Sequence, residues 1–211
     1  IAADLTGGTM GVDALDLRVG PSVMTADLSR DADGFLSGDA RLRTTDISGL
    51  AALALAEAAG AVDLTLALAS AAGGQRVTAR GGIAAIAAGP VTIDTGDVNL
   101  TIDNAMGVPA IGGTLDFAGL SARGVTVETG ALSAETDQTA TRLRLTRLIA
   151  GGTTIDTAGT LTRLADGFSA SLEQFDIANG REIAALDQPA FLRISGGKLG
   201  LATLAMRIGG T

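Results

Sequence analysis

Residues 62–69 read VDLTLALA, and this stretch decides the fold class. Val62, Leu64, Leu66 and Leu68 alternate with polar or small residues, so an extended chain would place their side chains on one face. The same period of two recurs at residues 15–19, 98–102, 115–117, 125–127, 143–145 and 192–194. The pattern predicts an all-β protein whose strands each have one apolar side.

Residue pairs that favour tight turns separate these stretches. They are Gly7-Gly8, Asp33-Gly34, Gly73-Gly74, Gly112-Gly113, Gly151-Gly152, Asp166-Gly167, Asn179-Gly180 and Gly196-Gly197. Residues 49–59 are instead rich in Ala and Leu, which favours a short helix or a wide turn there. We therefore expect residues 1–211 to form a single elongated β-repeat segment with at most one short helix.

The apolar side of such strands must be aliphatic. Hydrophobic residues make up 46% of the chain but aromatic residues only 2%, with neither Trp nor Tyr. A sheet with one aliphatic face can close as a β-solenoid, pack on a second sheet, or form an open groove for an apolar ligand. Small aliphatic walls suit a flexible acyl chain, because they have no rings to obstruct its sliding.

The composition argues against catalysis and against nucleic acid. The chain has no His, Cys or Tyr, which removes most general bases, nucleophiles and soft metal ligands. We expect no enzyme activity, cofactor or metal. A net charge of −8 disfavours phosphate backbones, and a carbohydrate-active β-helix enzyme is disfavoured because no Trp or Tyr is present to stack on a sugar.

Nothing in the chain predicts a membrane-spanning helix, because no apolar run approaches the ~20 residues required. The chain begins at Ile1 without a charged segment typical of a leader. We therefore expect an internal segment of a longer protein, with any membrane anchor outside it.

Residues 161–208 carry a set of turn patterns that point to a known family. A strand ends in Leu186-Asp187-Gln188-Pro189-Ala190, and the next strand is followed by Gly196-Gly197 and a Leu-rich stretch. This arrangement resembles the central repeats of the TamB family, the inner-membrane components of the translocation and assembly module, which are AsmA-like bridge-like lipid transfer proteins. Residues 46–60, before the strand at 62–68, also resemble the short helical interruption of that family.

The resemblance implies a β-taco, an elongated curled sheet with an open aliphatic groove, that crosses the periplasm. It implies phospholipid transport between the inner and outer membranes and support of outer-membrane protein assembly. It also implies an inner-membrane tether by a helix outside this chain, and contact with an outer-membrane barrel of the TamA type through parts outside this chain. The expected partners within this segment are phospholipid acyl chains.

The predicted lining of the groove is aliphatic throughout. Its residues are Val62, Leu64, Leu66, Leu68, Leu143, Leu145, Leu192, Ile194, Leu199 and Leu201. The alternative is a structural β-solenoid, such as the stalk of a secreted adhesin or autotransporter passenger, in which these residues are sealed in a closed coil. The two hypotheses differ in whether the apolar face is accessible.

Overall fold

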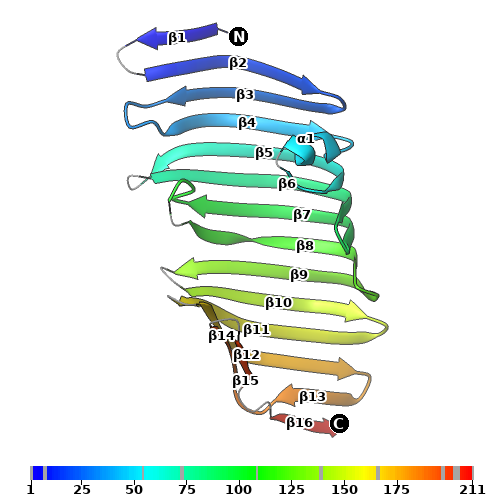
Figure 1. Cartoon of the computed structure of the whole chain (residues 1–211). Coiled ribbons are helices and arrows are strands. Elements are labelled where there is room, and N and C mark those ends of the chain that lie inside the picture. Colours follow the sequence, from blue (N-terminus) through cyan, green and yellow to red (C-terminus); the bar gives the residue numbers. More distant parts are fainter. Residues whose placement is uncertain are drawn as a thin grey trace.

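The computed structural model describes residues 2–6, 9–53, 55–71, 74–107, 109–137, 140–164, 167–195, 198–201 and 205–210. Side chains are described from Leu15 onward, except those of residues 53, 194, 195, 198, 199, 201 and 210. Within these ranges the chain forms one layer of β-strands, stacked largely in chain order, with a single short helix (Figure 1).

The elements have the following bounds. They are β1 (Ala2–Thr6), β2 (Thr9–Val19), β3 (Ser22–Arg30), β4 (Leu36–Thr44), α1 (Ser48–Leu53), β5 (Ala59–Ala71), β6 (Gly74–Ala88), β7 (Val91–Asp103), β8 (Ala110–Ala122), β9 (Val125–Asp137), β10 (Ala140–Ala150), β11 (Thr153–Leu164), β12 (Gly167–Asn179), β13 (Glu182–Leu186), β14 (Ala190–Ser195), β15 (Lys198–Leu201) and β16 (Met206–Gly210).

Every pair of neighbouring strands is antiparallel, and the strands follow chain order from β1 to β13; β16 then pairs with β13 after the chain has formed β14 and β15. Among the strands that the structure describes, the sheet is open, with β1 and β16 at its two ends. The all-β prediction is confirmed, and the architecture is the elongated open sheet, since a solenoid would stack its strands in parallel. The helix or wide turn expected near residues 49–59 is α1 with the bend that follows it.

The sheet divides at β12. One end of this strand, Asp176–Asn179, pairs with β13, while the other end, Gly167–Leu172, pairs with β14. β13 continues to β16, and β14 forms a hairpin with β15. Figure 1 shows this hairpin leaving the main stack beside β11 and β12.

The turn predictions have mixed outcomes. Gly151-Gly152 and Gly180 connect strands as expected. Gly112-Gly113 was wrong as a turn, because both residues pair with β9 inside β8. Several other turns, among them Gly20-Pro21, Gly89-Pro90 and Arg123-Gly124, were not predicted. Gly7-Gly8, Gly73, Asp166 and Gly196-Gly197 lie outside the described residues.

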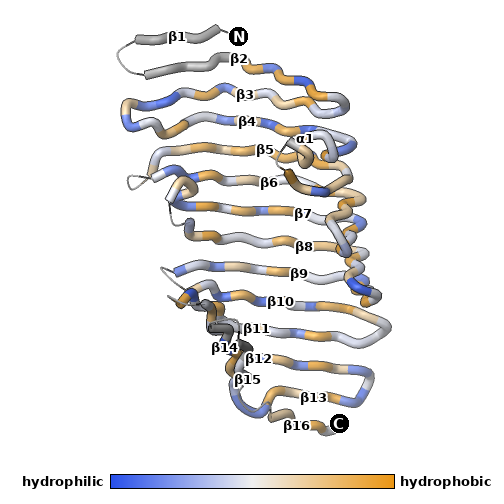
Figure 2. The backbone as a smooth tube through the Cα atoms, in the orientation of Figure 1, coloured by the Kyte–Doolittle hydropathy of each residue, from blue (hydrophilic) through white to orange (hydrophobic). Residues whose placement is uncertain are grey.

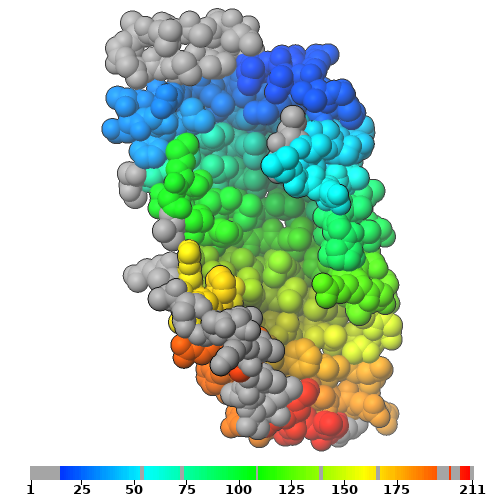
Figure 3. All heavy atoms as spheres, viewed as in Figure 1, coloured from blue at the N-terminus to red at the C-terminus, as the bar shows by residue number. Residues whose placement is uncertain are grey.

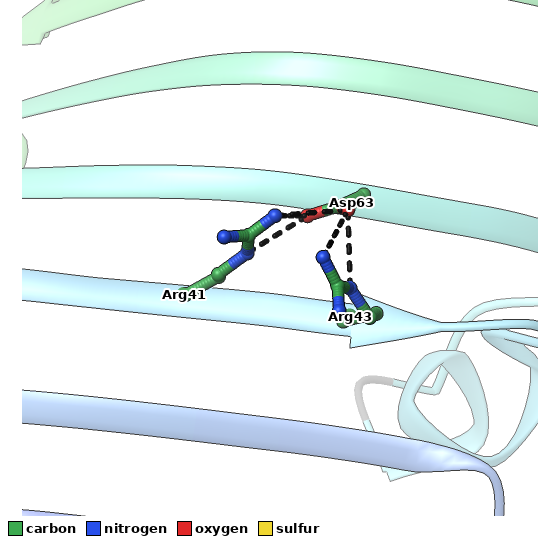
Figure 4. A network of polar contacts seen from close by, with 3 residues as sticks. All are labelled: Arg41, Arg43 and Asp63. Atoms are coloured by element: carbon green, nitrogen blue, oxygen red, sulfur yellow. Dashed lines mark hydrogen bonds and ion pairs between the residues drawn. The ribbon is translucent and has the colours of Figure 1, made fainter.

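The two faces of the sheet differ sharply in chemistry. Directly opposed residues of antiparallel strands project to the same face, so the register sorts the side chains into rows across the sheet. Rows of aliphatic residues alternate with rows of Asp, Arg, Thr and Ser, which gives the alternating colours along each strand in Figure 2. On the polar face, Asp63 of β5 accepts hydrogen bonds from Arg41 and Arg43 of β4, with Arg–Asp distances of 3.0 Å (Figure 4).

A line of backbone irregularities crosses the sheet near one end of the strands. The pairing is interrupted between Ala59 and Ala61 and between Leu145 and Leu148, and φ is positive at Ala85, Gly119 and Arg147. β-Bulges of this kind bend a strand and increase its twist. Because they lie in register on neighbouring strands, we call this line the crease.

The crease folds the strand ends toward one face and makes that face concave. In Figure 1 these ends bend toward the viewer beside α1, and Figure 3 shows a hollow running along the middle of the molecule between two raised margins. α1 lies in front of the sheet in Figure 1 and behind Arg41 and Arg43 in Figure 4. The charged face is therefore the convex one, and the aliphatic face is the concave one.

Candidate functional site

Three aliphatic rows form what we call the floor of the concave face. The first row contains Leu17, Met24, Leu42, Leu64, Gly81, Val98, Leu115, Leu132, Leu145, Thr157 and Phe175. The second contains Leu15, Ala26, Ala40, Leu66, Ala79, Leu100, Gly113, Ala134, Leu143, Gly159, Leu172 and Ala190. The third contains Leu28, Gly38, Leu68, Val77, Ile102 and Ile111 and resumes at Leu161, Ala170 and Leu192.

The floor brings together residues that the sequence analysis singled out separately. Leu64 and Leu145 share the first row, and Leu66 and Leu143 share the second. Strands far apart in the sequence therefore contribute to one surface. The sequence supplied the face of each strand, but only the register shows that these faces align.

Two groups of predicted residues need separate description. Val62 projects to the same face but is only 5% exposed, between Thr44 and Ile83 on the neighbouring strands, so it is buried and not part of the solvent-exposed surface. The side chains of Ile194, Leu199 and Leu201 lie outside the described residues. Their backbones place Ile194 opposite Phe168 and Leu199, and Leu201 opposite Leu192.

The floor remains in contact with solvent. Among its members, Leu17 is 46% exposed, Ile111 39%, Leu161 37% and Leu143 36%, and most of the others are half-buried. A hollow of about 210 Å³ lies on this face, lined by Leu143, Leu145, Leu161, Leu172 and their neighbours on β11 and β12. Two elements stand beside or in front of this face: α1 at β4 and β5, and the β14–β15 hairpin at β11 and β12 (Figure 1).

Larger depressions occur on the convex face but have a different chemistry. One of about 570 Å³ is lined by hydroxyl groups of β11 and β12 and by Phe191, Leu192 and Arg193 of β14. Another, of about 540 Å³, lies among Asp16, Thr25, Asp39 and Arg41. The first combines hydroxyl groups with the ring of Phe191, and the second combines charged groups with Leu15, Ala26 and Ala40. The hollow at Leu143 is instead lined chiefly by aliphatic side chains, so we assign acyl-chain binding to the floor.

One margin of the groove carries further apolar residues beyond the crease. Ile86 pairs with Ile93, Leu120 with Val127, and Leu148 with Ile155. The left-handed conformation of Arg147 brings Leu148 to the same face as Phe117, and both side chains lie over Gly130. Alternation alone would have placed Leu148 on the convex face, because it is an odd number of residues from Leu145.

Phe117 is the principal buried side chain of this margin and was not predicted as a site residue. It is 7% exposed and stands opposite Gly96 and Gly130 on its two neighbouring strands. The missing side chain of Gly130 leaves space for the ring, because a Cβ atom there would lie 2.6 Å from it; the space at Gly96 is occupied by Ile83 and Leu115. The sequence does show a Phe in an alternating strand and glycines in the neighbouring strands. Only the pairing register between the strands shows that these residues stand opposite one another.

Several Arg and Asp side chains on the convex face form ion pairs across neighbouring strands. Hydrogen bonds from Arg41 first, and then from Arg43, hold the pKa of Asp63 below its usual value. Arg76 pairs with Asp103 across β6 and β7, which raises the pKa of the guanidinium. These ion pairs keep the side chains of the convex face ionised and solvated, and they lie on the face opposite the floor.

The fold and site together define a single-layer, open antiparallel β-sheet with an aliphatic concave face and a charged convex face. Comparison with known proteins adds no relative: no family model, no curated protein and no solved structure matches the chain. Among the residues that the structure describes, no helix has the length and hydropathy needed to span a membrane.

Proposed function

We propose that this chain is a segment of a TamB-like lipid bridge and that its floor carries phospholipid acyl chains. The observation that supports this most strongly is a largely aliphatic face, partly exposed to solvent, whose first two rows extend from β3 to β12. Soluble monomers seldom leave an apolar patch of more than a few hundred Å² exposed unless it binds something. The near absence of aromatic residues agrees with a surface along which a flexible chain slides.

The length of the floor favours transport of a lipid along it over binding of a lipid at one fixed site. Neighbouring strands are about 4.8 Å apart, so the floor from β3 to β12 extends roughly 43 Å. One acyl chain spans about half of a ~30 Å bilayer core. A tail lying along the groove therefore has several equivalent positions, each lined by the same kinds of side chain.

Burial of an acyl chain on the floor provides enough free energy for binding. Each methylene that leaves water contributes about 0.8 kcal/mol, so eight methylenes on the floor contribute roughly 6 kcal/mol before the cost of immobilisation. The polar headgroup would stay at the open mouth, in contact with water.

In this proposal the segment works in the periplasm, within a protein tethered to the inner membrane by a helix elsewhere. Contact with an outer-membrane barrel of the TamA type, and support of outer-membrane protein assembly, would involve parts outside this chain. These assignments rest on the resemblance of residues 46–68 and 161–208.

The test is site-specific photo-crosslinking in cells. A photoreactive residue at Leu66, on the floor, is expected to capture phospholipid, while the same residue at Ala67, its neighbour on the convex face, is not. Crosslinks from Leu66 to protein alone would refute the conduit and favour the structural stalk.

A charge at the same position gives a second measurement. Leu66→Arg is expected to block lipid passage without unfolding the sheet, because the long arginine stem can lie along the floor with its head in water. Ala67→Arg is the matched control on the opposite face. Global unfolding of Leu66→Arg would instead show that Leu66 belongs to a packed core.

A further inference from the structure

Two short segments rise over the concave face from opposite margins of the groove. One is α1 with residues 55–58, which connects β4 to β5, and the other is residues 104–107, between β7 and β8. Figure 3 shows α1 on one side of the hollow and the green surface around residue 105 on the other. We call these segments the two brackets.

The α1 bracket is held firmly at its base. The Asp46 carboxylate accepts hydrogen bonds from the backbone N–H of Ser48 at 2.9 Å and from its hydroxyl at 2.8 Å. The N–H of Ile47 donates to the carbonyl of Gly60 at 2.8 Å. Ala51 is 8% exposed, so α1 is packed onto the sheet and is not a free loop.

The second bracket is fixed through Gln75. The N–H of Ala105 donates to the Gln75 carbonyl at 2.8 Å, and the Gln75 side chain is only 2% exposed. Its amide accepts from the N–H of Leu36 at 2.7 Å and donates to the carbonyls of Leu36 and Ala69 at 2.9 and 3.2 Å. A buried, fully bonded glutamine thus ties this bracket to β4 and β5.

The tips of both brackets are apolar and exposed. Leu55 is 97% exposed and Met106 67%. Leu55 also adopts a left-handed conformation, with φ of 56°, which is unfavourable for a leucine and more readily adopted by Gly or Asn. Leu55 therefore combines high exposure with a backbone conformation that is costly for its residue type.

We propose that Leu55 and Met106 retain an acyl chain on the floor. The two segments flank the hollow in Figure 3, and each carries one exposed apolar side chain. In this proposal a tail lying between them is contacted from the sides as well as from below. This inference rests on the proposed function. The brackets would slow the escape of the lipid tail through the open side of the groove, while the tail could still move along the floor.

The experiment measures release of a preloaded lipid. The 211-residue chain is loaded with NBD-labelled phosphatidylethanolamine and mixed with excess unlabelled phosphatidylcholine vesicles. The Leu55→Ser, Met106→Ser double variant is expected to release the probe roughly tenfold faster, which corresponds to losing about two methylene-sized contacts. Ile183→Ser, at a residue 40% exposed on the convex face, is the matched control and should release at the original rate.

The outcomes separate the two proposals. If the double variant releases lipid at the original rate while a crosslinker at Leu66 still captures lipid, the retention role of the brackets is refuted and the proposal that the floor carries lipid stands. Failure of Leu66 to capture lipid in any variant would refute the conduit itself. Crosslinkers at Leu55 and Met106 that capture only another protein would also overturn retention, by showing that the tips are a docking surface.

Discussion

Two adjacent glycines of β6 allow a direct test of the backbone geometry of the floor. Gly81 belongs to the first floor row and has a φ of +146°, which L-residues rarely adopt. A Cβ atom on Gly81 would lie 2.0 Å from the carbonyl oxygen of Asp63 and 3.0 Å from the Cα of Leu64. Gly82 projects to the convex face, where a Cβ atom would meet nothing closer than 3.8 Å. The two positions differ by one residue and have opposite steric environments.

We expect Gly81→Ala to lower the free energy of unfolding by about 3 kcal/mol, because a left-handed or mirror-extended conformation costs of order 1–3 kcal/mol for an L-residue and backbone atoms of β5 must also move. Gly82→Ala should be neutral or stabilising by about 0.5 kcal/mol, since alanine reduces the entropy of the unfolded chain. For a chain of this size, 3 kcal/mol corresponds to a fall in Tm of about 6 to 12 °C.

The assay is urea and thermal unfolding followed by circular dichroism, with both variants compared with the unsubstituted chain. If Gly81→Ala unfolds within about 1 kcal/mol of Gly82→Ala, then β5 and β6 do not approach as described, and the register of the first floor row must be revised.

Two further predictions concern polar contacts. Gln75→Leu leaves the N–H and carbonyl of Leu36 without their side-chain partner. Loss of these buried hydrogen bonds should lower the free energy of unfolding in urea by about 3 kcal/mol. Gln188→Leu, at an exposed position, is the control, and equal stability of the two variants would contradict the hydrogen bonds between the Gln75 side chain and Leu36. Asp63 has a lowered pKa in the folded state, so its ion pairs stabilise the sheet above pH ~4 and this contribution is lost as pH falls through the folded pKa. The stability difference between the unsubstituted chain and Asp63→Asn should therefore shrink between pH 7 and pH 3, and a constant difference would show that the pairs with Arg41 and Arg43 do not form.

Much of the fold could be predicted because alternation is a local property. The pattern at Val62 to Leu68 gives both the strand and the identity of its apolar face, and the absence of Trp and Tyr indicates that this face is aliphatic. The short helix was visible in the Ala- and Leu-rich composition of residues 49–59. These signals need no knowledge of which strand lies beside which.

The rest depends on contacts between strands. The place of Phe117 follows from Gly130 on the neighbouring strand β9, and the role of Gln75 follows from a backbone group 39 residues away. Gly112-Gly113 looked like a turn because two glycines are compatible with both a hairpin and a closely approached strand. Ala85 and Arg147 adopt positive φ, which their residue types do not favour, so the crease has no clear local signal.

The crease also constrains how this architecture can change in length. An extra residue between the crease and the floor would move one strand's bend out of line with its neighbours and turn its leucines to the wrong face. Residues added at the hairpin tips, or whole hairpins added to the stack, leave that alignment untouched. Proteins built on this plan should therefore vary in hairpin number and tip length while conserving the spacing from bend to floor.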